Sequence, residues 1–175
     1  MSTAQKGFVQ VYTGNGKGKT TAAAGLAARA AGRGMRVFFA QFAKGRPSGE
    51  LTALRRLGDL VTVRQYGRAR FIGPKPLRAD IAAAREGLAE ARAALLSGVY
   101  RMVILDEINI ATSCKLLDVK AVLGLISQRP AQVELVLTGR KADPRVIAAA
   151  DLVTEMREIK HYYRRGVMAR KGIEH

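Results

Sequence analysis

The stretch from position 13 to position 21 has the composition of a loop that binds phosphate groups. It follows an apolar, strand-like run and leads into an alanine-rich, helix-like run. In that context glycines let backbone N–H groups approach phosphate oxygens, the helix start adds unpaired donors, the lysine reaches the outer phosphates and the threonine hydroxyl ligates Mg²⁺. We call this stretch the phosphate loop and predict that it binds nucleotide through Thr13, Gly14, Asn15, Gly16, Lys17, Gly18, Lys19, Thr20 and Thr21.

The phosphate loop departs from the usual pattern at its first position. Gly-x-x-x-x-Gly-Lys-Ser/Thr requires glycine at position 13, but the chain has Thr13, and its first glycine, Gly14, comes one residue later. A glycine-rich turn that merely caps the helix is the alternative, although few such turns contain Gly-Lys-Thr-Thr at this spacing. We therefore predict that Lys19 reaches the outer phosphates and that Thr20 ligates Mg²⁺.

Two carboxylates end an apolar run and form the second strong signal. Asp106 and Glu107 follow Met102–Leu105, which has the composition of a buried strand. In nucleotide-binding α/β proteins an acid at this strand end holds Mg²⁺ beside the phosphate loop. Capping of the next helix is the alternative role. We predict a metal site formed by Thr20, Asp106 and Glu107, and the sequence leaves open which carboxylate ligates directly.

Loops after two other predicted strands contain further candidate residues. Lys44 and Glu50 lie in a polar, turn-rich segment after one strand, and Phe71 and Ile72 lie in a glycine- and proline-bordered segment after the next. Loops at the carboxyl ends of parallel strands form the ligand crevice of open α/β sheets. Phe71 is predicted either to contact a ligand or to pack on the core. Arg29 is predicted to face either solvent or the nucleotide.

Helix-like and strand-like runs alternate along the whole chain. The predicted strands are Phe8–Tyr12, Met35–Phe42, Val61–Tyr66, Arg101–Glu107, Gln132–Leu137 and Asp151–Ile159. The predicted helices are Ala22–Ala31, Leu51–Leu57, Arg78–Ser97, Asp118–Gln128 and one that starts at Asp143–Pro144. This alternation predicts an α/β fold with a mostly parallel central sheet and helices on both faces, in a single RecA-like phosphate-loop domain over residues 1–175.

Composition narrows the functional classes. The 175 residues suffice for one domain with a full core, and no apolar run is long enough to cross a membrane. A single cysteine, Cys114, excludes an internal disulfide and, with no signal segment, predicts a cytoplasmic protein. The net charge of +16 indicates an anionic partner. Because the basic residues are spread along the chain without an aromatic-basic stripe, we do not expect a nucleic acid partner.

Taken together, several blocks resemble the phosphate-loop class of corrinoid adenosyltransferases. The resemblance runs from about residue 7 to the C-terminus, and generic phosphate-loop enzymes share only the first block and the Asp-Glu strand. The blocks are Val11–Thr21, Gln41-Phe42-x-Lys44-Gly45, Gly49-Glu50-Leu51, Ile104–Asn109, Leu137–Arg140, Ala150–Met156, Glu158–His161 and Ala169–Glu174.

The resemblance implies that cobalt(I) of a corrinoid attacks C5′ of ATP and that inorganic triphosphate leaves. Members of the family are understood to bind ATP in reversed orientation, with Mg²⁺ or Mn²⁺, and to act as homodimers. The resemblance also implies catalytic roles for Lys19, Thr20 and Glu107 and nucleotide contact for Arg29. Corrinoid contact is expected of Lys44, Glu50, Tyr66, Phe71 and Ile72. The high positive charge then suits an acidic electron donor such as flavodoxin.

Three alternatives remain at this point. A generic phosphate-loop ATPase or kinase would release ADP or phosphate, a RecA-like module would bind nucleic acid, and a regulator would bind ATP without turnover. The sequence also departs from relatives that cover the corrinoid with an N-terminal helix, since only Met1–Lys6 precede the first predicted strand. We therefore expect the corrinoid site to lack that cover or to be covered by another segment.

In the family that the sequence resembles, apolar residues near the corrin remove the axial ligand of cobalt(II) and so ease its reduction to cobalt(I). Phe71 is our candidate for this role, and Phe71→Ala should then impair the reduction more than the adenosyl transfer. We expect lower activity when cob(II)alamin and a mild reductant are supplied, and a smaller loss with chemically prereduced cob(I)alamin. The two assays are compared at equal enzyme concentration. Equal losses in both would contradict a role for Phe71 in the reduction.

Overall fold

The sheet contains six strands, and every neighbouring pair is parallel. The computed structural model describes residues 5–68 and 76–174. Along the sheet the strand order is β3-β2-β4-β5-β1-β6, so β5 separates the strand before the phosphate loop from the strand that ends in Asp106. The strands are β1 (Val9–Thr13), β2 (Val37–Phe42), β3 (Val61–Tyr66), β4 (Met102–Asp106), β5 (Glu134–Thr138) and β6 (Leu152–Glu155).

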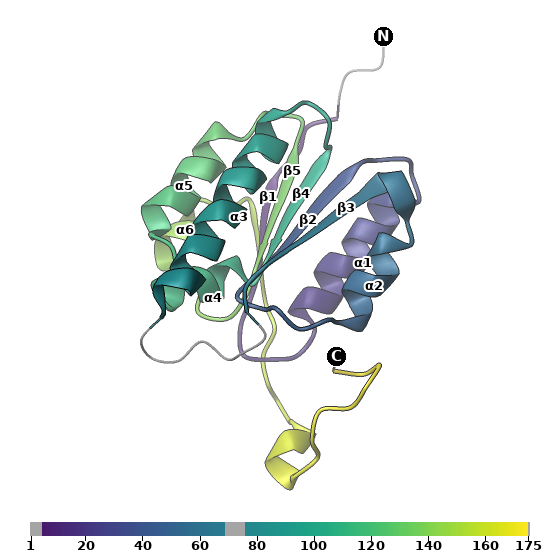
Figure 1. Cartoon of the computed structure of the whole chain (residues 1–175), viewed down its shortest axis with the longest axis vertical. Coiled ribbons are helices and arrows are strands. Elements are labelled where there is room, and N and C mark those ends of the chain that lie inside the picture. Colours follow the sequence, from purple (N-terminus) through teal and green to yellow (C-terminus); the bar gives the residue numbers. More distant parts are fainter. Residues whose placement is uncertain (1–4, 69–75, 175) are drawn as a thin grey trace.

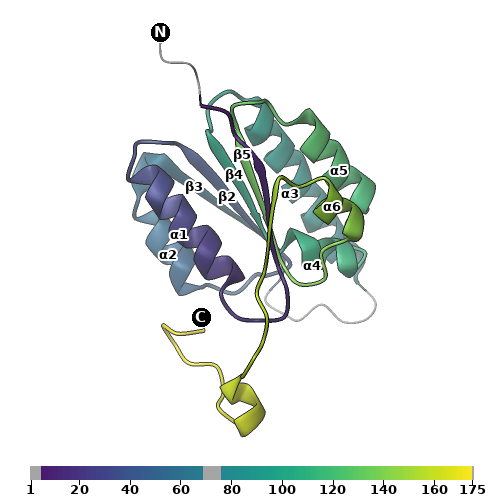
Figure 2. The same ribbon diagram turned by 180° about the vertical axis from the view of Figure 1, so that it is seen from behind.

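Helices cover both faces of the sheet, as Figures 1 and 2 show from opposite sides. One face carries α1 (Lys19–Ala31) and α2 (Gly49–Arg55). The other face carries α3 (Arg78–Leu96), α4 (Ile108–Ser113), α5 (Val119–Gln128) and α6 (Pro144–Ala148). Two short 3₁₀ helices span Gly58–Leu60 and Tyr162–Arg165. This layered arrangement confirms the predicted α/β fold class.

Two separate apolar cores form because successive strand residues point to opposite faces. On the α1 and α2 side, Phe39 and Ile104 pack against the alanines of α1. On the other side, Phe38 and Leu105 pack against α3, α4 and α5. Strands that are buried on both faces read as continuous apolar runs, which is why their sequence predicted parallel strands.

The predicted elements agree with the structure except at several boundaries. The helix after the phosphate loop begins at Lys19, three residues earlier than predicted, so the loop's Lys-Thr-Thr forms its first turn. The last strand is shorter than predicted and stops at Glu155. The short helix α4 was not predicted, because six residues directly after a strand are too few to show a helical period.

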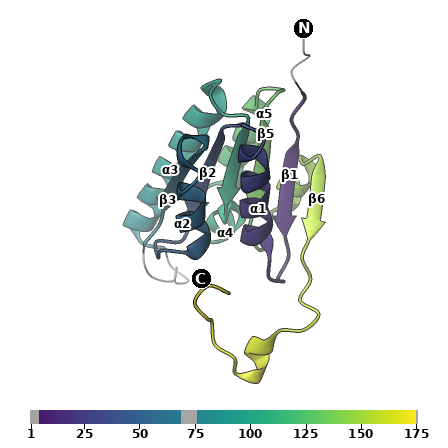
Figure 3. The same ribbon diagram turned by 90° about the vertical axis from the view of Figure 1, so that its right-hand side faces the viewer.

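Because all strands run in one direction, their carboxyl ends meet at one edge of the sheet. The phosphate loop, the loop before α2 and the turn after β4 lie at this edge. Figure 3 shows the chain after β6 crossing beneath the same edge before it ends near α1 and α2. Among the described residues, no helix combines the length and the apolar character needed to cross a membrane.

Two helical glycines provide a matched test of the packing. A Cβ at Gly87 of α3 would lie 2.6 Å from the Tyr66 ring, whereas a Cβ at Gly25 of α1 would meet no atom within 4 Å. We expect Gly87→Ala to lower the free energy of unfolding by about 1–3 kcal/mol through overpacking. Gly25→Ala should raise it by about 0.5–1 kcal/mol through helix propensity. Urea denaturation measures both, and stabilisation by Gly87→Ala would contradict the contact.

Candidate active site

The lysine of the phosphate loop, Lys19, is buried and hydrogen-bonded to the backbone of the loop. Gly18 precedes α1 with φ of 118°, a left-handed conformation that favours glycine. Lys19 is 6% exposed, and its ammonium donates to the carbonyl oxygen of Gly16 at 2.6 Å. Burial lowers the pKa of Lys19, and the positive charge of Arg140 lowers it further. The ammonium is therefore held at the loop, where an incoming anion would favour its charged form.

The Asp106 carboxylate is fully buried and accepts hydrogen bonds from three different elements. The Thr20 hydroxyl of α1 donates at 2.9 Å, the Gln41 amide of β2 at 2.8 Å, and the Thr138 hydroxyl of β5 at 2.6 Å. A carboxylate has about four lone-pair sites, so these donors occupy most of its capacity. Asp106 thus fixes the Thr20 hydroxyl with its proton turned inward and its lone pairs free for a cation.

Glu107 has a different environment, although it is the next residue. Its φ of 61° is left-handed, an uncommon conformation for a non-glycine residue, and its N–H donates to the Thr138 hydroxyl at 3.0 Å. It stands at the N-cap position of α4 but makes no side-chain cap. Its carboxylate instead lies 3.8 Å from the Lys44 ammonium. The structure therefore argues against the helix-capping alternative for Glu107.

Charge balance sets the ionisation of Glu107. Burial raises the pKa of its carboxyl, and the nearby Asp106 carboxylate raises it further, while Lys44, Lys19 and Arg140 oppose the shift. Two carboxylates and three cations thus meet at the mouth of the phosphate loop. The two neighbouring carboxylates repel each other, and a divalent cation bound beside them would relieve that repulsion.

The chain beyond β6 packs directly on the phosphate loop. The N–H of Gly16 donates to the Met156 carbonyl at 2.6 Å, and the N–H of Met156 donates to the Thr13 carbonyl at 2.9 Å. A Cβ at Gly14 would lie only 2.4 Å from the Met156 carbonyl oxygen. The late first glycine of the loop is therefore required by this close approach of the chain after β6.

Lys17 contacts this same part of the chain and not the interior of the loop. Its ammonium donates to the Glu174 carboxylate at 3.0 Å, to the Ile173 carbonyl at 2.9 Å and to the Tyr162 hydroxyl at 3.2 Å. Hydrogen bonds to Arg170 and then Tyr162 hold the pKa of Glu174 well below its usual range. Lys17 thus joins residues 162–174 to the phosphate loop by a charged contact.

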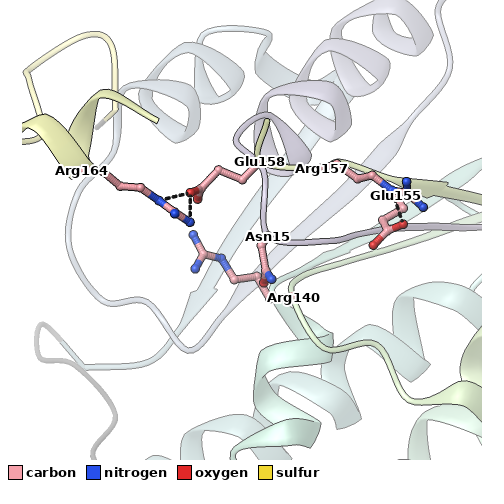
Figure 4. Close-up of a pocket in the computed structure, with 6 residues that line it drawn as sticks. All are labelled: Asn15, Arg140, Glu155, Arg157, Glu158 and Arg164. Atoms are coloured by element: carbon pink, nitrogen blue, oxygen red, sulfur yellow. Dashed lines mark hydrogen bonds and ion pairs between the residues drawn. The ribbon is translucent and has the colours of Figure 1, made fainter. Parts of the chain in front are cut away.

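A cavity of about 530 Å³ lies between the phosphate loop and the chain after β6. Figure 4 shows the Arg140 side chain entering it next to the ion pair of Arg164 with Glu158, whose closest atoms are 2.7 Å apart. The lining residues are Asn15, Arg140, Glu155, Arg157, Glu158 and Arg164. Arg140 is exposed, and its charge acts on both Lys19 and Glu107, so the cavity opens beside the mouth of the loop.

The structure brings five of the predicted site residues together. They are Lys19, Thr20, Lys44, Asp106 and Glu107, joined by the contacts described above. Asn15 lines the adjacent cavity. This cluster draws on three loops that are far apart in the sequence, which agrees with the rule that ligands bind at the carboxyl ends of parallel strands.

Other predicted residues lie elsewhere. Arg29 is in the last turn of α1, about 15 Å along the helix from Lys19 at a rise of about 1.5 Å per residue. Tyr66 is 7% exposed, with its ring on Phe42 and its hydroxyl bonded to Glu90. Glu50 is in the first turn of α2. Phe71 and Ile72 lie outside the described residues, so their predicted corrinoid contact stays a prediction.

Sequence reasoning missed three polar side chains that complete the site. Gln41 is the next-to-last residue of β2 and Thr138 is the last residue of β5, and both are fully buried. Arg140 follows Thr138 by two residues in the loop after β5. A polar residue that closes an apolar strand was the available signal, since a buried polar group needs a partner.

Comparison with known proteins identifies close relatives. A family model described as ATP:corrinoid adenosyltransferase BtuR/CobO/CobP matches residues 5–175. A corrinoid adenosyltransferase of Pseudomonas aeruginosa is 40% identical over 97% of this chain and 84% of its own length. Corrinoid adenosyltransferases of Escherichia coli and Salmonella typhimurium are 38% and 36% identical, each over 98% of this chain and 87% of their own length.

The raised pKa of Glu107 predicts a stability change with a defined sign. The folded protein holds this proton to higher pH than the unfolded chain, so the carboxyl costs stability as pH rises through its folded pKa. We expect Glu107→Gln to be more stable than the parent protein at pH 7.5. That gain should disappear near pH 4, where an ordinary glutamate with a pKa of about 4.3 is also protonated. Urea denaturation at both pH values tests this, and a gain of equal size at both would contradict it.

Proposed function

The chain belongs to the ATP:corrinoid adenosyltransferase family, and we propose that its phosphate loop holds the triphosphate of ATP as the leaving group. In this reaction a bond forms between cobalt(I) of the corrinoid and C5′ of ATP. The bond between C5′ and its oxygen breaks, and its electron pair departs with triphosphate. The enzyme thus transfers an adenosyl group from ATP to a corrinoid, unlike a kinase, which exposes the terminal phosphorus.

One observation carries the catalytic assignment. Lys19, Thr20 and Glu107 converge at the phosphate loop, with Asp106 orienting Thr20 from beneath. Cobalt(I) is a strong nucleophile and needs no base to activate it, so the required work is positioning and charge neutralisation. The cluster supplies a cation, a set of backbone donors and a metal-binding edge, which suits that work.

The donor set fits a magnesium or manganese ion. Among residues 5–68 and 76–174 no three His, Cys, Asp or Glu side chains converge to form a complete metal cage. Mg²⁺ commonly takes only one or two protein oxygens and fills the rest with phosphate and water. Thr20 and Glu107 would hold it, with Asp106 orienting the Thr20 hydroxyl. When bound, the cation neutralises charge on the triphosphate.

Arg140 is the next group we assign to the triphosphate. In the described residues its guanidinium has no ion-pair or hydrogen-bond partner, yet its charge acts on Lys19 and Glu107. Guanidinium groups bind phosphate oxygens through paired N–H donors. We therefore assign Arg140 to the anion from the side of the cavity that it lines. Asn15 at the same cavity adds a polar contact near the start of the loop.

We assign the acceptor side of the site to the loop after β2 and, from the sequence alone, to the segment after β3. Lys44 lies there at the Glu107 carboxylate, and the segment with Phe71 and Ile72 follows β3. We assign corrinoid contact to this side, because attack on C5′ must come from the face opposite the departing triphosphate. The net charge of +16 also favours transient docking of an acidic electron donor, and we propose that the chain assembles as a homodimer.

Lys19→Ala tests the assignment directly. Loss of a contact to the developing charge costs about 10²–10³-fold in rate, and loss of the central lysine is expected to reduce turnover at least that far while the fold survives. Lys120→Ala, at an exposed position on α5, should behave like the parent protein. Protein, MgATP and cobalamin are mixed with a strong reductant, and the visible spectrum and the phosphate product are followed.

Adenosylcobalamin together with triphosphate supports the proposal. Release of ADP without a cobalt–carbon bond would assign the site to a phosphoryl-transfer reaction instead. An active Lys19→Ala enzyme with unchanged thermal unfolding would show that the phosphate loop does not hold the leaving group.

A further inference from the structure

Three neighbouring strands place polar side chains in one row at the carboxyl edge of the sheet. Gln41 of β2 is in register with Asp106 of β4 on one side and with Gln65 of β3 on the other. Paired residues of parallel strands point to the same face, so all three face α1 and the phosphate loop. Gln41 is fully buried and Gln65 is half-buried. The cluster of polar side chains around Asp106 therefore continues into β2 and β3.

The charge of Asp106 sets the direction of every hydrogen bond in this row. An ionised carboxylate only accepts, so Gln41 must present its amide nitrogen to Asp106, at 2.8 Å. The Gln41 amide oxygen then faces β3 and needs a donor, which the Gln65 nitrogen provides at 2.9 Å. Reversing either amide would place two acceptors together in a buried site, which costs about 1–3 kcal/mol.

The second N–H of Gln65 holds the loop that carries Lys44. It donates to the carbonyl oxygen of Arg46 at 3.0 Å. The backbone of Lys44 also lies against Gly67, where a Cβ would come within 2.7 Å of it. Lys44 in turn reaches back to Glu107. The contacts thus run in a circuit from Asp106 through two amides and one loop to Glu107, the residue next to Asp106.

We propose that Gln41 and Gln65 are positioning residues. The hydrogen bonds from Asp106 through Gln41 and Gln65 to the loop of Lys44, which we call the amide relay, fix Lys44 and Glu107 relative to Thr20, so that the metal–ATP complex is bound in one geometry. The inference rests on the metal site of the proposed function. Outer hydrogen-bond partners orient metal ligands, and their loss commonly costs about 10–100-fold in metal affinity or activity. Neither glutamine needs to touch ATP or the corrinoid in this role.

Gln65→Met removes the relay without adding charge and leaves a side chain of similar length. We expect the dissociation constant of Mn²⁺ in the presence of ATP to rise about tenfold, the low end for an outer partner. Free Mn²⁺ is measured by electron paramagnetic resonance, with no corrinoid present. Arg64→Met is the matched control, because it lies on the same strand but points to the opposite face, where it pairs with Glu90. It should change the constant less than twofold.

A double-mutant comparison separates a relay from two independent contacts. Gln41→Met should weaken Mn²⁺ binding at least as much as Gln65→Met. The double variant should bind like Gln41→Met alone, because the contacts lie in series and loss of either glutamine already interrupts them. Multiplied effects in the double variant would overturn the relay. So would parent-like binding by Gln65→Met while Glu107→Gln binds weakly. Parent-like binding by Glu107→Gln would instead overturn the metal assignment itself and, with it, the relay.

Thermal unfolding of each variant checks that the fold persists. If Gln41→Met does not fold, Gln65→Glu takes its place, since a carboxylate there keeps the shape but cannot donate to the Gln41 oxygen. It should weaken Mn²⁺ binding at least as much as Gln65→Met. Binding equal to that of the parent protein would overturn the proposal.

Discussion

The site depends on one buried carboxylate and the cost of leaving it without partners. Asp106 has no exposed surface, so its charge is tolerated only because donors from α1, β2 and β5 converge on it. Those donors meet only where parallel strands in this order end together beneath the start of α1. The hydrogen bonds therefore hold the phosphate loop in a fixed relation to the sheet, and they leave the Glu107 carboxylate beside Lys44 at the mouth of the loop.

The phosphate loop is supported from both sides by different forces. On the inner side Thr20 is tied to Asp106, and on the outer side the loop backbone pairs with the chain at Met156. Lys17 extends the outer support through its charged contact with Glu174. The departure of the loop from the usual glycine spacing is thus explained by packing, since the close approach at Gly14 comes from the chain after β6. The same departure suits a reaction in which the whole triphosphate leaves.

Most of the fold was predictable because its signals are local. Alternating apolar runs, the turn residues between them and the N-caps Asp118 and Asp143 all act over a few residues. The misses have the same explanation: α4 is too short to show a period, and the end of β6 depends on its pairing with β1, not on composition. Within the site, Lys19, Thr20, Asp106 and Glu107 were recognisable from motif spacing, whereas Gln41 and Thr138 were noticed only as members of family-like blocks and Gln65 lies in no block at all.

By itself the sequence determined that a phosphate loop and a strand-terminal acid pair lie in an α/β fold, because spacing along the chain controls loop conformation and strand direction. Only the tertiary structure decided which acid orients Thr20 and which faces Lys44, because that choice depends on which neighbouring strands supply donors. It also turned Lys17 outward, toward residues more than a hundred positions away. Side chains from separate strands come into contact only through sheet order and register, which no local pattern encodes.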